Sequence, residues 1–431
     1  MSNVFAILLM AASAAATQPQ AIALHARRLL DVRSGSVAEA YIVVRGDRIE
    51  AVAKSAPADA KVIDLGNATV LPGLIDCHVH VEADWNDLSA TANLRQSSPR
   101  KTLMALKNAQ EYLSRGFTTL RDAGTTDPAY DTVALRDALA KGMFLGPSLF
   151  VAGVPISVTG GHADLNPLAP DVPMQPLPNI ADTVDEARKA VRHDIRNGVD
   201  WVKVMASGGV MDVLSDYHVQ ELSDEQLRAI VEDTHRAGRK TMAHAEGLAG
   251  IRAAVHAGID TIEHGSMLDD ATAKEMAERG TWLVPTINTF YRGVELGLTQ
   301  GQEPQMLEKG KAILEYIPDA IAAALRNHVK IAFGDDDDPR FVADEFKQMV
   351  KLGLTPLAAL QAATVNAAAL LGASDRIGTI EPGRYADVVA VDGDPLKDIG
   401  AMGRVVFVMK GGSVARSAGV PPAGEAASRR P

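Results

Sequence analysis

Residues 222–244 read LSDEQLRAIVEDTHRAGRKTMAH, and two different hydrophobic periodicities meet within this stretch. Residues 222–238 carry apolar side chains three and four positions apart, which is the spacing of one face of an amphipathic helix. The run at 240–244 is short, largely apolar and ends at a polar residue, His244. The stretch therefore predicts a helix that leads directly into a buried strand.

Alternation of this kind recurs along the middle of the chain. Short, largely apolar runs occur at 117–122, 201–205 and 330–334, and another helical pattern occupies 356–371. Repeated strand and helix units favour a parallel (β/α)₈ barrel of the TIM type, which we place at residues 72–371. A doubly wound sheet is the alternative, but no glycine-rich dinucleotide-binding motif follows a predicted strand.

The two ends of the chain have a different character. Residues 41–49, 387–391 and 404–412 are rich in β-branched and apolar side chains and lie beside turn residues, which is typical of short strands. We expect residues 18–71 and 372–415 to form one small β-sandwich domain that both chain ends build together. The expected fold class is α/β, a TIM-like barrel with this sandwich attached.

The first residues resemble an export signal. Residues 4–12 are apolar and small residues follow at 13–17, as in a secretory signal peptide, although no Lys or Arg precedes the run. We expect residues 1–17 to be a signal peptide that sends the protein to the periplasm or outside the cell; a disordered alanine-rich leader is the alternative. Residues 416–431 are expected to be a disordered tail.

Composition excludes several classes of protein. The chain has 431 residues, of which 47% are hydrophobic, so a large core can form. A net charge of −11 without a basic cluster argues against a nucleic-acid partner. Outside the leader, no apolar stretch approaches the length of a membrane span, so no membrane partner is expected. Cys77 is the only cysteine, which excludes an intrachain disulfide and a cysteine-rich zinc site.

Two histidines stand two positions apart in the segment 74–80, which reads LIDCHVH. In a strand, alternate residues share a face, so Asp76, His78 and His80 would point the same way. Two imidazoles on one face at the end of a strand can chelate one cation. An HxH motif alone arises often by chance, and its preceding residues give it its specificity.

The longer segment 71–80, LPGLIDCHVH, resembles the signature of the amidohydrolase superfamily. The resemblance extends over nearly the whole chain, and the branch it points to is the imidazolonepropionase-related one, which includes Xaa-Pro-type dipeptidases and ochratoxin-hydrolysing amidases. The other segments that carry the resemblance are 202–209, 243–247, 261–265, 333–336, 362–367 and 383–389.

The resemblance implies a centre of two divalent metal ions, which we expect to be zinc. His78 and His80 match the ligands of the first ion, and His244 and His264 match those of the second. Lys203 matches a lysine that is carboxylated on its amine and bridges both ions. Asp336 matches the aspartate that binds the first ion and acts as general base.

The residues support this assignment on physical grounds. The candidate ligands end short apolar runs, which is where barrel active sites are built. Lys203 lies between Val202 and Val204, and a lone cation on a buried strand is costly. Desolvation lowers the pKa of the amine, and a neutral amine can add CO₂ to give an anionic ligand. The alternative is a buried lysine that pairs with a carboxylate.

The run of four aspartates at 335–338 leaves the choice of base open. Asp336 shares its parity with the small Ala332 and Gly334, whereas Asp335 shares its parity with bulky side chains that should face the helices. We therefore assign the base to Asp336. The family usually has threonine in place of Asp335, and an extra acid here could raise the pKa of the base by charge repulsion.

Two residues are expected to contact substrate. His162 follows two glycines, which suit close approach to a ligand, and the related branch has a similar Gly-Gly-His. Tyr217 lies in a loop after the Lys203 strand and could polarise a carbonyl or hold a carboxylate. The alternatives are a turn histidine at the surface and a solvated loop tyrosine.

The resemblance implies hydrolysis of the amide bond next to a C-terminal amino acid, in dipeptides or N-acyl amino acids, including ochratoxin-like amides. A metal-bridging hydroxide would attack the carbonyl, and Asp336 would move the proton to the leaving amine. The metal ligands alone would serve a cyclic amidase, a lactonase or an esterase equally well. A non-catalytic periplasmic binding protein is a further alternative. We expect a small-molecule substrate and a homo-oligomer.

Overall fold

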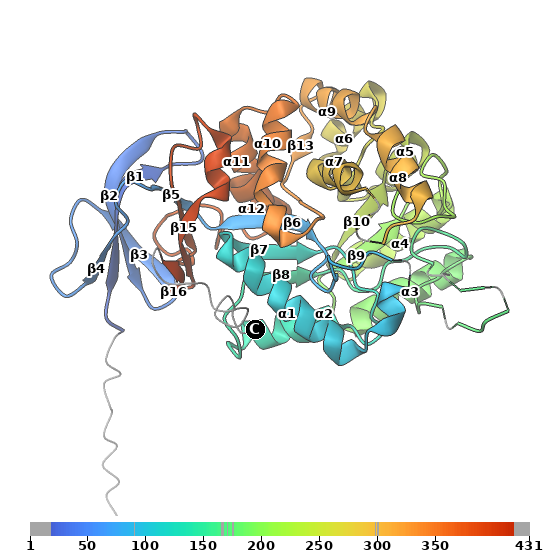
Figure 1. Cartoon of the computed structure of the whole chain (residues 1–431), viewed down its shortest axis with the longest axis horizontal. Helices are drawn as coiled ribbons and strands as arrows, with labels where there is room; N and C mark the ends of the chain where they lie inside the picture. Colours follow the sequence, from blue (N-terminus) through green and yellow to red (C-terminus); the bar gives the residue numbers. More distant parts are fainter. Residues whose placement is uncertain are drawn as a thin grey trace, which may run out of the picture.

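The chain folds into a barrel domain with a β-sheet domain at one end (Figure 1). The computed structural model describes residues 19–417 except 90, 165–167, 170, 175, 298 and 300. The predicted signal peptide and nearly all of the predicted tail lie outside these residues, although the last strand of the sheet includes Arg416 and Ser417. In the described part of the chain, no helix has the length and hydrophobicity to cross a membrane.

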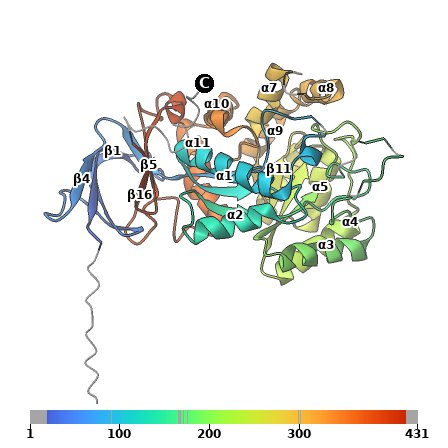
Figure 2. The same ribbon diagram turned by 60° about the horizontal axis from the view of Figure 1, so that its bottom comes forward.

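The small domain combines the two ends of the chain (Figure 2). Its strands, as far as the structure describes them, form one mostly antiparallel sheet in the order β16-β15-β14-β5-β1-β2-β3, with β4 also paired to β1. They are β1 (Ile22–Leu30), β2 (Val37–Arg45), β3 (Arg48–Ala53), β4 (Lys61–Asp64), β5 (Thr69–Pro72), β14 (Val388–Val391), β15 (Val405–Lys410) and β16 (Ser413–Ser417).

This sheet folds over itself, so it encloses a core of its own. Leu24 and Ile42 from the first half and Val388 and Phe407 from the second are buried in one apolar cluster. Edge strand β3 also reaches the segment before β14, because Ile49 donates a backbone hydrogen bond to the carbonyl of residue 384. The strands from the two chain ends thus build one small β domain together, as the sequence predicted.

Parallel strands form the barrel, and the described residues contain eight of them. They are β6 (Leu74–Val79), β7 (Phe117–Asp122), β8 (Ser148–Val151), β9 (Trp201–Met205), β10 (Lys240–Ala245), β11 (Thr261–His264), β12 (Trp282–Val284) and β13 (Lys330–Ile331). Hydrogen bonds join strands β6, β7 and β8 into one group and the five strands from β9 through β13 into another.

Two backbone contacts close the barrel between these groups. Ile156, just after β8, pairs with Val204 of β9 in parallel register. The amide of Cys77 in β6 donates to the carbonyl of Phe333, just after β13, at 2.8 Å. The carboxyl ends of the strands therefore meet at one mouth, as in other (β/α)₈ barrels.

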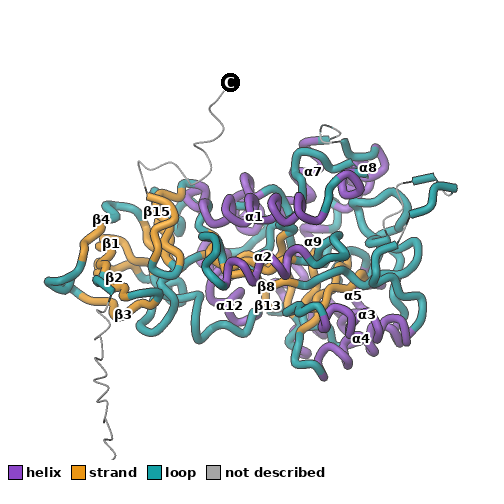
Figure 3. Tube along the Cα trace, turned by 90° about the horizontal axis from the view of Figure 1, so that it is seen from below, coloured by secondary structure: helices purple, strands orange, loops and turns teal. Residues whose placement is uncertain are grey.

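Helices follow the strands and lie outside them (Figure 3). The helix predicted from residues 222–238 is α4 (Asp224–Arg236), and its start is set by a capping box: the Ser223 hydroxyl accepts from the amide of Gln226, and the Gln226 side chain accepts from the amide of Ser223. The other outer helices are α1 (Ser98–Ser114), α2 (Asp131–Ala140), α3 (Val184–Arg196), α5 (Leu248–Ala257), α6 (Asp270–Arg279), α9 (Ile317–Arg326), α10 (Ala343–Lys351), α11 (Pro356–Gln361) and α12 (Ala367–Leu370).

Two further helices stand beside the mouth of the barrel. They are α7 (Ile287–Leu296) and α8 (Pro304–Ile313), and both contribute side chains to the cavity at the carboxyl ends of the strands.

Candidate metal centre

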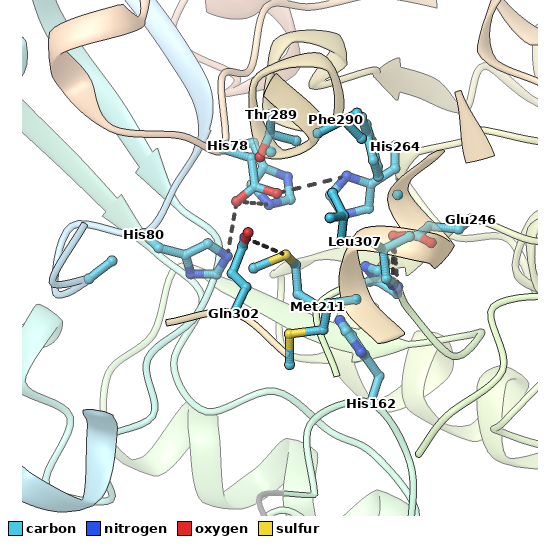
Figure 4. A pocket seen from close by; sticks show the side chains of 18 of the residues that line it. His78, His80, His162, Met211, Glu246, His264, Thr289, Phe290, Gln302 and Leu307 are labelled. Atoms are coloured by element: carbon cyan, nitrogen blue, oxygen red, sulfur yellow. Dashed lines mark hydrogen bonds and ion pairs between the residues drawn. The ribbon is translucent and has the colours of Figure 1, made fainter. Parts of the chain in front are cut away.

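All six predicted metal ligands line one cavity at the barrel mouth (Figure 4). The cavity has a volume of about 250 Å³. Strands β6, β9, β10 and β11 and the segment after β13 supply these side chains, so residues far apart in sequence converge at one place. The six are His78, His80, Lys203, His244, His264 and Asp336.

Asp336 lies at the centre of three of the histidines. One carboxylate oxygen is 3.7 Å from Nε2 of His78 and 3.5 Å from Nε2 of His80. The other oxygen is 4.0 Å from Nδ1 of His264. One potential ligand atom from each of His78, His264 and Asp336 lies within 4.8 Å of the other two. A single cation between them could bind all three.

The HxH histidines are each held by one ring nitrogen. Nδ1 of His78 is 2.7 Å from a carboxylate oxygen of Glu263, and Nδ1 of His80 is 3.0 Å from the carbonyl oxygen of Gly124. Both partners accept hydrogen bonds, so each Nδ1 donates and each Nε2 keeps a lone pair. Nε2 of His78 is buried and has no hydrogen-bond partner in the described part of the chain, which is the state expected of a nitrogen that binds a cation.

His244 and His264 are also held through one ring nitrogen each, and only His244 uses Nε2. Nε2 of His244 donates to the carbonyl of Gly208 at 3.1 Å, which leaves Nδ1 for a cation. Nδ1 of His264 lies 2.7 Å from the hydroxyl of Thr286, which leaves Nε2. Burial lowers the pKa of both imidazoles well below the ordinary value, so both rings stay neutral and able to bind metal.

Lys203 is buried in the wall of the same cavity, with 1% of its surface exposed. Among the described residues, no carboxylate lies within 4 Å of its amine, so the alternative of a paired lysine is not what the structure shows. Burial lowers the pKa of the amine to about 8, and the nearby charges of Glu263 and Asp336 oppose that shift only in part. A larger fraction of the amine is therefore neutral near pH 7 than in an exposed lysine.

The aspartates at 335–338, which follow β13, have different surroundings. Burial raises the pKa of Asp336 to about 7, Lys203 opposes the shift and the charge of Asp337 adds to it. Asp335 does not line the cavity, and both of its oxygens are buried without a hydrogen-bond partner among the described residues. Asp337 pairs with Arg292 at 2.5 Å.

Simple strand alternation does not place His264 in the site. Glu263, not His264, faces the barrel interior, and Ile262 packs in the outer core. His264 reaches the mouth because its backbone takes a left-handed conformation, with φ of 70°. Asp336 is also left-handed, with φ of 51°, and follows a strand that ends at Ile331.

Sequence reasoning missed the ion pair behind the HxH motif. Arg121 of β7 is fully buried and donates to both oxygens of Glu263, at 2.9 and 3.0 Å. Glu263 in turn holds His78. Part of the signal was present, since Arg121 lies inside the predicted strand at 117–122 and a buried charge needs a partner of opposite sign.

His162 lines the cavity, whereas Tyr217 does not. The His162 ring stacks on His244 at 4.3 Å, and its Nδ1 lies 2.5 Å from Asp212. A Cβ on Gly209 would lie 2.2 Å from the His162 ring, so glycine is required for this approach. The Tyr217 side chain is buried in the core rather than solvated or turned to the cavity.

Comparison with known proteins agrees with this geometry. Residues 69–415 match the family model described as "Amidohydrolase family". This chain belongs to the amidohydrolase family. Ochratoxinase of Aspergillus niger is 34% identical over 382 residues, which cover 83% of this chain and 77% of that protein. Its crystal structure covers 94% of this chain and 97% of its own, with a TM-score of 0.80 and 29% identity.

Two other relatives broaden the comparison. An Xaa-Pro dipeptidase with methionine bound in its active site has a TM-score of 0.86 and 32% identity, over 92% of this chain and all of that one. Imidazolonepropionase of Pseudomonas putida is 26% identical over 400 residues, which cover 85% of this chain and 90% of that protein. The predicted family and barrel fold are confirmed. The protein is a hydrolase of amide or peptide C–N bonds, in a family that is generally metal-dependent.

Proposed function

We propose that this protein is a binuclear metal-dependent amidohydrolase that cleaves the amide bond next to a C-terminal amino acid, in dipeptides or N-acyl amino acids. The observation that carries the proposal is the arrangement of four histidines. Each one uses a ring nitrogen to bond the protein and leaves the other for a cation. Carboxylated Lys203 would complete the set as an anionic bridge between two ions, for which zinc suits the imidazole and carboxylate ligands.

The residues divide into holding and proton-moving groups. Two bound divalent cations would supply a Lewis acid for the scissile carbonyl and lower the pKa of a water. Asp336 would accept the proton of that water and pass it to the nitrogen of the leaving amine. His162, held by Asp212, would contact the substrate through Nε2.

The cavity favours apolar substrates. Its walls beyond the metal ligands are formed mainly by apolar side chains from β9, the loop that follows it, α7 and α8. A bulky, uncharged acyl side chain would bury this surface at a gain of about 25 cal/mol per Å². The apolar residues include Met205, Val210, Met211, Phe290, Val294, Met306 and Leu307.

The test is a hydrolysis screen on protein prepared with zinc and bicarbonate. We expect turnover of apolar dipeptides or N-acyl amino acids, two zinc ions per chain by elemental analysis, and loss of activity with a chelator that zinc restores. One ion or none per chain would contradict the binuclear centre. Turnover confined to lactones, esters or cyclic amides would contradict the substrate class and favour an alternative of the same fold.

Export and assembly are also proposals. We propose that residues 1–17 direct export and are removed, and that the mature protein forms a homo-oligomer. N-terminal sequencing of protein from the periplasm or medium would test the first, with an intact leader as the contrary outcome. Light scattering would test the second, and a monomeric mass would contradict it.

A further inference from the structure

Glu246 is an acid in the cavity wall that the proposed reaction does not use. It follows β10 two residues after His244, and Figure 4 shows its side chain beside the histidines. The residue is 3% exposed. Its Oε1 accepts one long hydrogen bond, of 3.4 Å, from the amide of Val210. Its Oε2 is buried and has no hydrogen-bond partner among the described residues.

No cation of the described residues neutralises this carboxylate. Nε2 of His244 is 4.0 Å away and already donates to a backbone carbonyl. Lys309 is close enough for its charge to favour the ionised form of Glu246, but its amine donates to the carbonyls of Gly209, Asp212 and Ser215. Glu246 is thus the one charged residue of the described cavity lining outside the six predicted metal ligands and the imidazole of His162.

An unpaired carboxylate in an apolar wall costs free energy, since it loses its hydration and gains no partner. A bound ligand with a positive charge next to the Glu246 carboxylate would offset this free-energy cost in the complex. The free oxygen therefore points to a substrate with a cationic or N–H group close to the metal centre.

We propose that Glu246 binds the α-ammonium group of a dipeptide substrate, so the enzyme prefers dipeptides with a free amino terminus to N-acyl amino acids. The inference rests on the proposed function and selects between its two substrate classes. In a dipeptide, the α-nitrogen is two bonds from the scissile carbonyl carbon. A carbonyl placed at the ligands His244 and His264 would thus bring the ammonium group beside Glu246.

The apolar walls agree with this placement. Met205 and Leu307 line the same cavity and would receive the side chain of the N-terminal residue. An N-acyl group would replace the ammonium with a neutral amide, which offers a single N–H donor and no charge. Glu246 would then stay without a counter-charge, and binding would be weaker.

The experiment compares L-methionyl-L-proline with its N-acetyl derivative, on wild type and on Glu246→Gln, both loaded with zinc. We expect wild type to show at least tenfold higher kcat/KM on the free dipeptide. Glu246→Gln should lose at least tenfold more kcat/KM on the free dipeptide than on the acetylated one. Equal losses on both substrates, or a wild-type preference for the acetylated one, would overturn the assignment.

Binding of the acyl-side products provides a readout that does not depend on turnover. L-Methionine should bind wild type more tightly than N-acetyl-L-methionine in a calorimetric titration, and Glu246→Gln should remove the difference. An unchanged preference in Glu246→Gln would overturn the assignment. If neither dipeptide is hydrolysed, the proposed function fails, and this titration still decides the role of Glu246.

Glu303→Gln is the matched control. Glu303 is an exposed acid that lines a second cavity, next to the one that holds the predicted metal ligands. Glu303→Gln therefore removes one negative charge, as Glu246→Gln does, without changing a residue that lines the metal-ligand cavity. We expect Glu303→Gln to change kcat/KM for both dipeptides by the same factor and to bind zinc as wild type does. A dipeptide-specific loss in Glu303→Gln as large as that in Glu246→Gln would show a general field effect and overturn the assignment.

Discussion

Nδ1 of His78 lies 2.7 Å from Oε2 of Glu263, and this contact links β6 to β11 across the interior of the barrel. Arg121 from β7 holds the same carboxylate from the other side. The carboxylate fixes which ring nitrogen of His78 carries the proton, and it directs the lone pair of Nε2 toward Asp336. Three barrel strands therefore cooperate to orient one predicted metal ligand.

Removal of the Glu263 charge should weaken the metal centre. Glu263→Gln leaves Arg121 without its buried partner and gives His78 a neutral neighbour. We expect about 10–100-fold weaker zinc binding, measured by competition with a chromogenic chelator. The unpaired Arg121 should also lower the free energy of unfolding by about 3–5 kcal/mol, measured in urea. Unchanged zinc affinity would refute the role given to Glu263.

Thr286 offers the same test without a buried charge. Thr286→Val removes the hydroxyl that lies 2.7 Å from Nδ1 of His264, whereas Thr286→Ser keeps it. We expect Thr286→Val to lose about tenfold or more in zinc affinity and Thr286→Ser to stay close to wild type. Equal affinities in the two variants would mean that the hydroxyl does not orient the imidazole.

Lys203 should matter as a carboxylate precursor rather than as a cation. Lys203→Ala should lose metal and activity, and short carboxylic acids should restore part of both because they can occupy the bridging position. Lys203→Arg should be inactive, since its guanidinium does not add CO₂ to form this ligand. Zinc content and kcat with and without added acetate decide the matter. Full activity in Lys203→Arg would contradict the bridge.

Asp336 is the predicted proton carrier. Asp336→Asn should lower kcat by about 10²–10⁴-fold or more, because an amide can offer an oxygen to a cation but cannot accept a proton. Much of the zinc should remain, since five other ligands persist.

Asp335→Asn is the matched control for Asp336→Asn, because Asp335 does not line the cavity and its oxygens have no hydrogen-bond partner among the described residues. Asp337→Asn is a poorer control, since it would break the ion pair with Arg292. If Asp335→Asn were inactive and Asp336→Asn kept near-normal turnover, the assignment of the base to Asp336 would be wrong.

Stability should depend on pH through a buried acid far from the metal centre. Burial raises the pKa of Asp194 to about 8 from an ordinary 3.8. Between these values the folded protein binds one proton more than the unfolded chain, so stability falls as pH rises, by about 1.4 kcal/mol per pH unit for this group. Asp194→Asn should flatten that slope, since its oxygen can still accept from Tyr130 and Asn179. Urea unfolding of wild type and Asp194→Asn at pH 5, 6.5 and 8 measures this slope of the free energy of unfolding.

Asp233 supplies a control of opposite sign. Its carboxylate pairs with Arg188 and Arg192, and these charges hold its pKa below the ordinary value despite its burial. The stability it contributes is present above the unfolded pKa and is lost as pH falls. Asp233→Asn should therefore lower stability at neutral pH and reduce its loss in acid. The same slope in both variants would contradict the assignment to Asp194.

Much of the fold and most of the site follow from local sequence. The helix at 224–236 begins at a Ser-x-x-Gln pair, and the largely apolar run at 240–244 ends at His244 at the barrel mouth. These signals are readable because helix period, capping and strand burial depend on residues within a few positions of each other. The HxH motif and its neighbours likewise identified the family before any contact was known.

Only the tertiary structure decided how the ligands are aimed. His264 and Asp336 reach the centre through left-handed backbone, not through strand alternation, and Gly334 permits this because a Cβ there would lie 2.8 Å from Cβ of His78. The hydrogen bond from His78 to Glu263 joins positions 185 residues apart. Such contacts depend on barrel closure and on backbone conformations that non-local packing selects, so no local pattern encodes them.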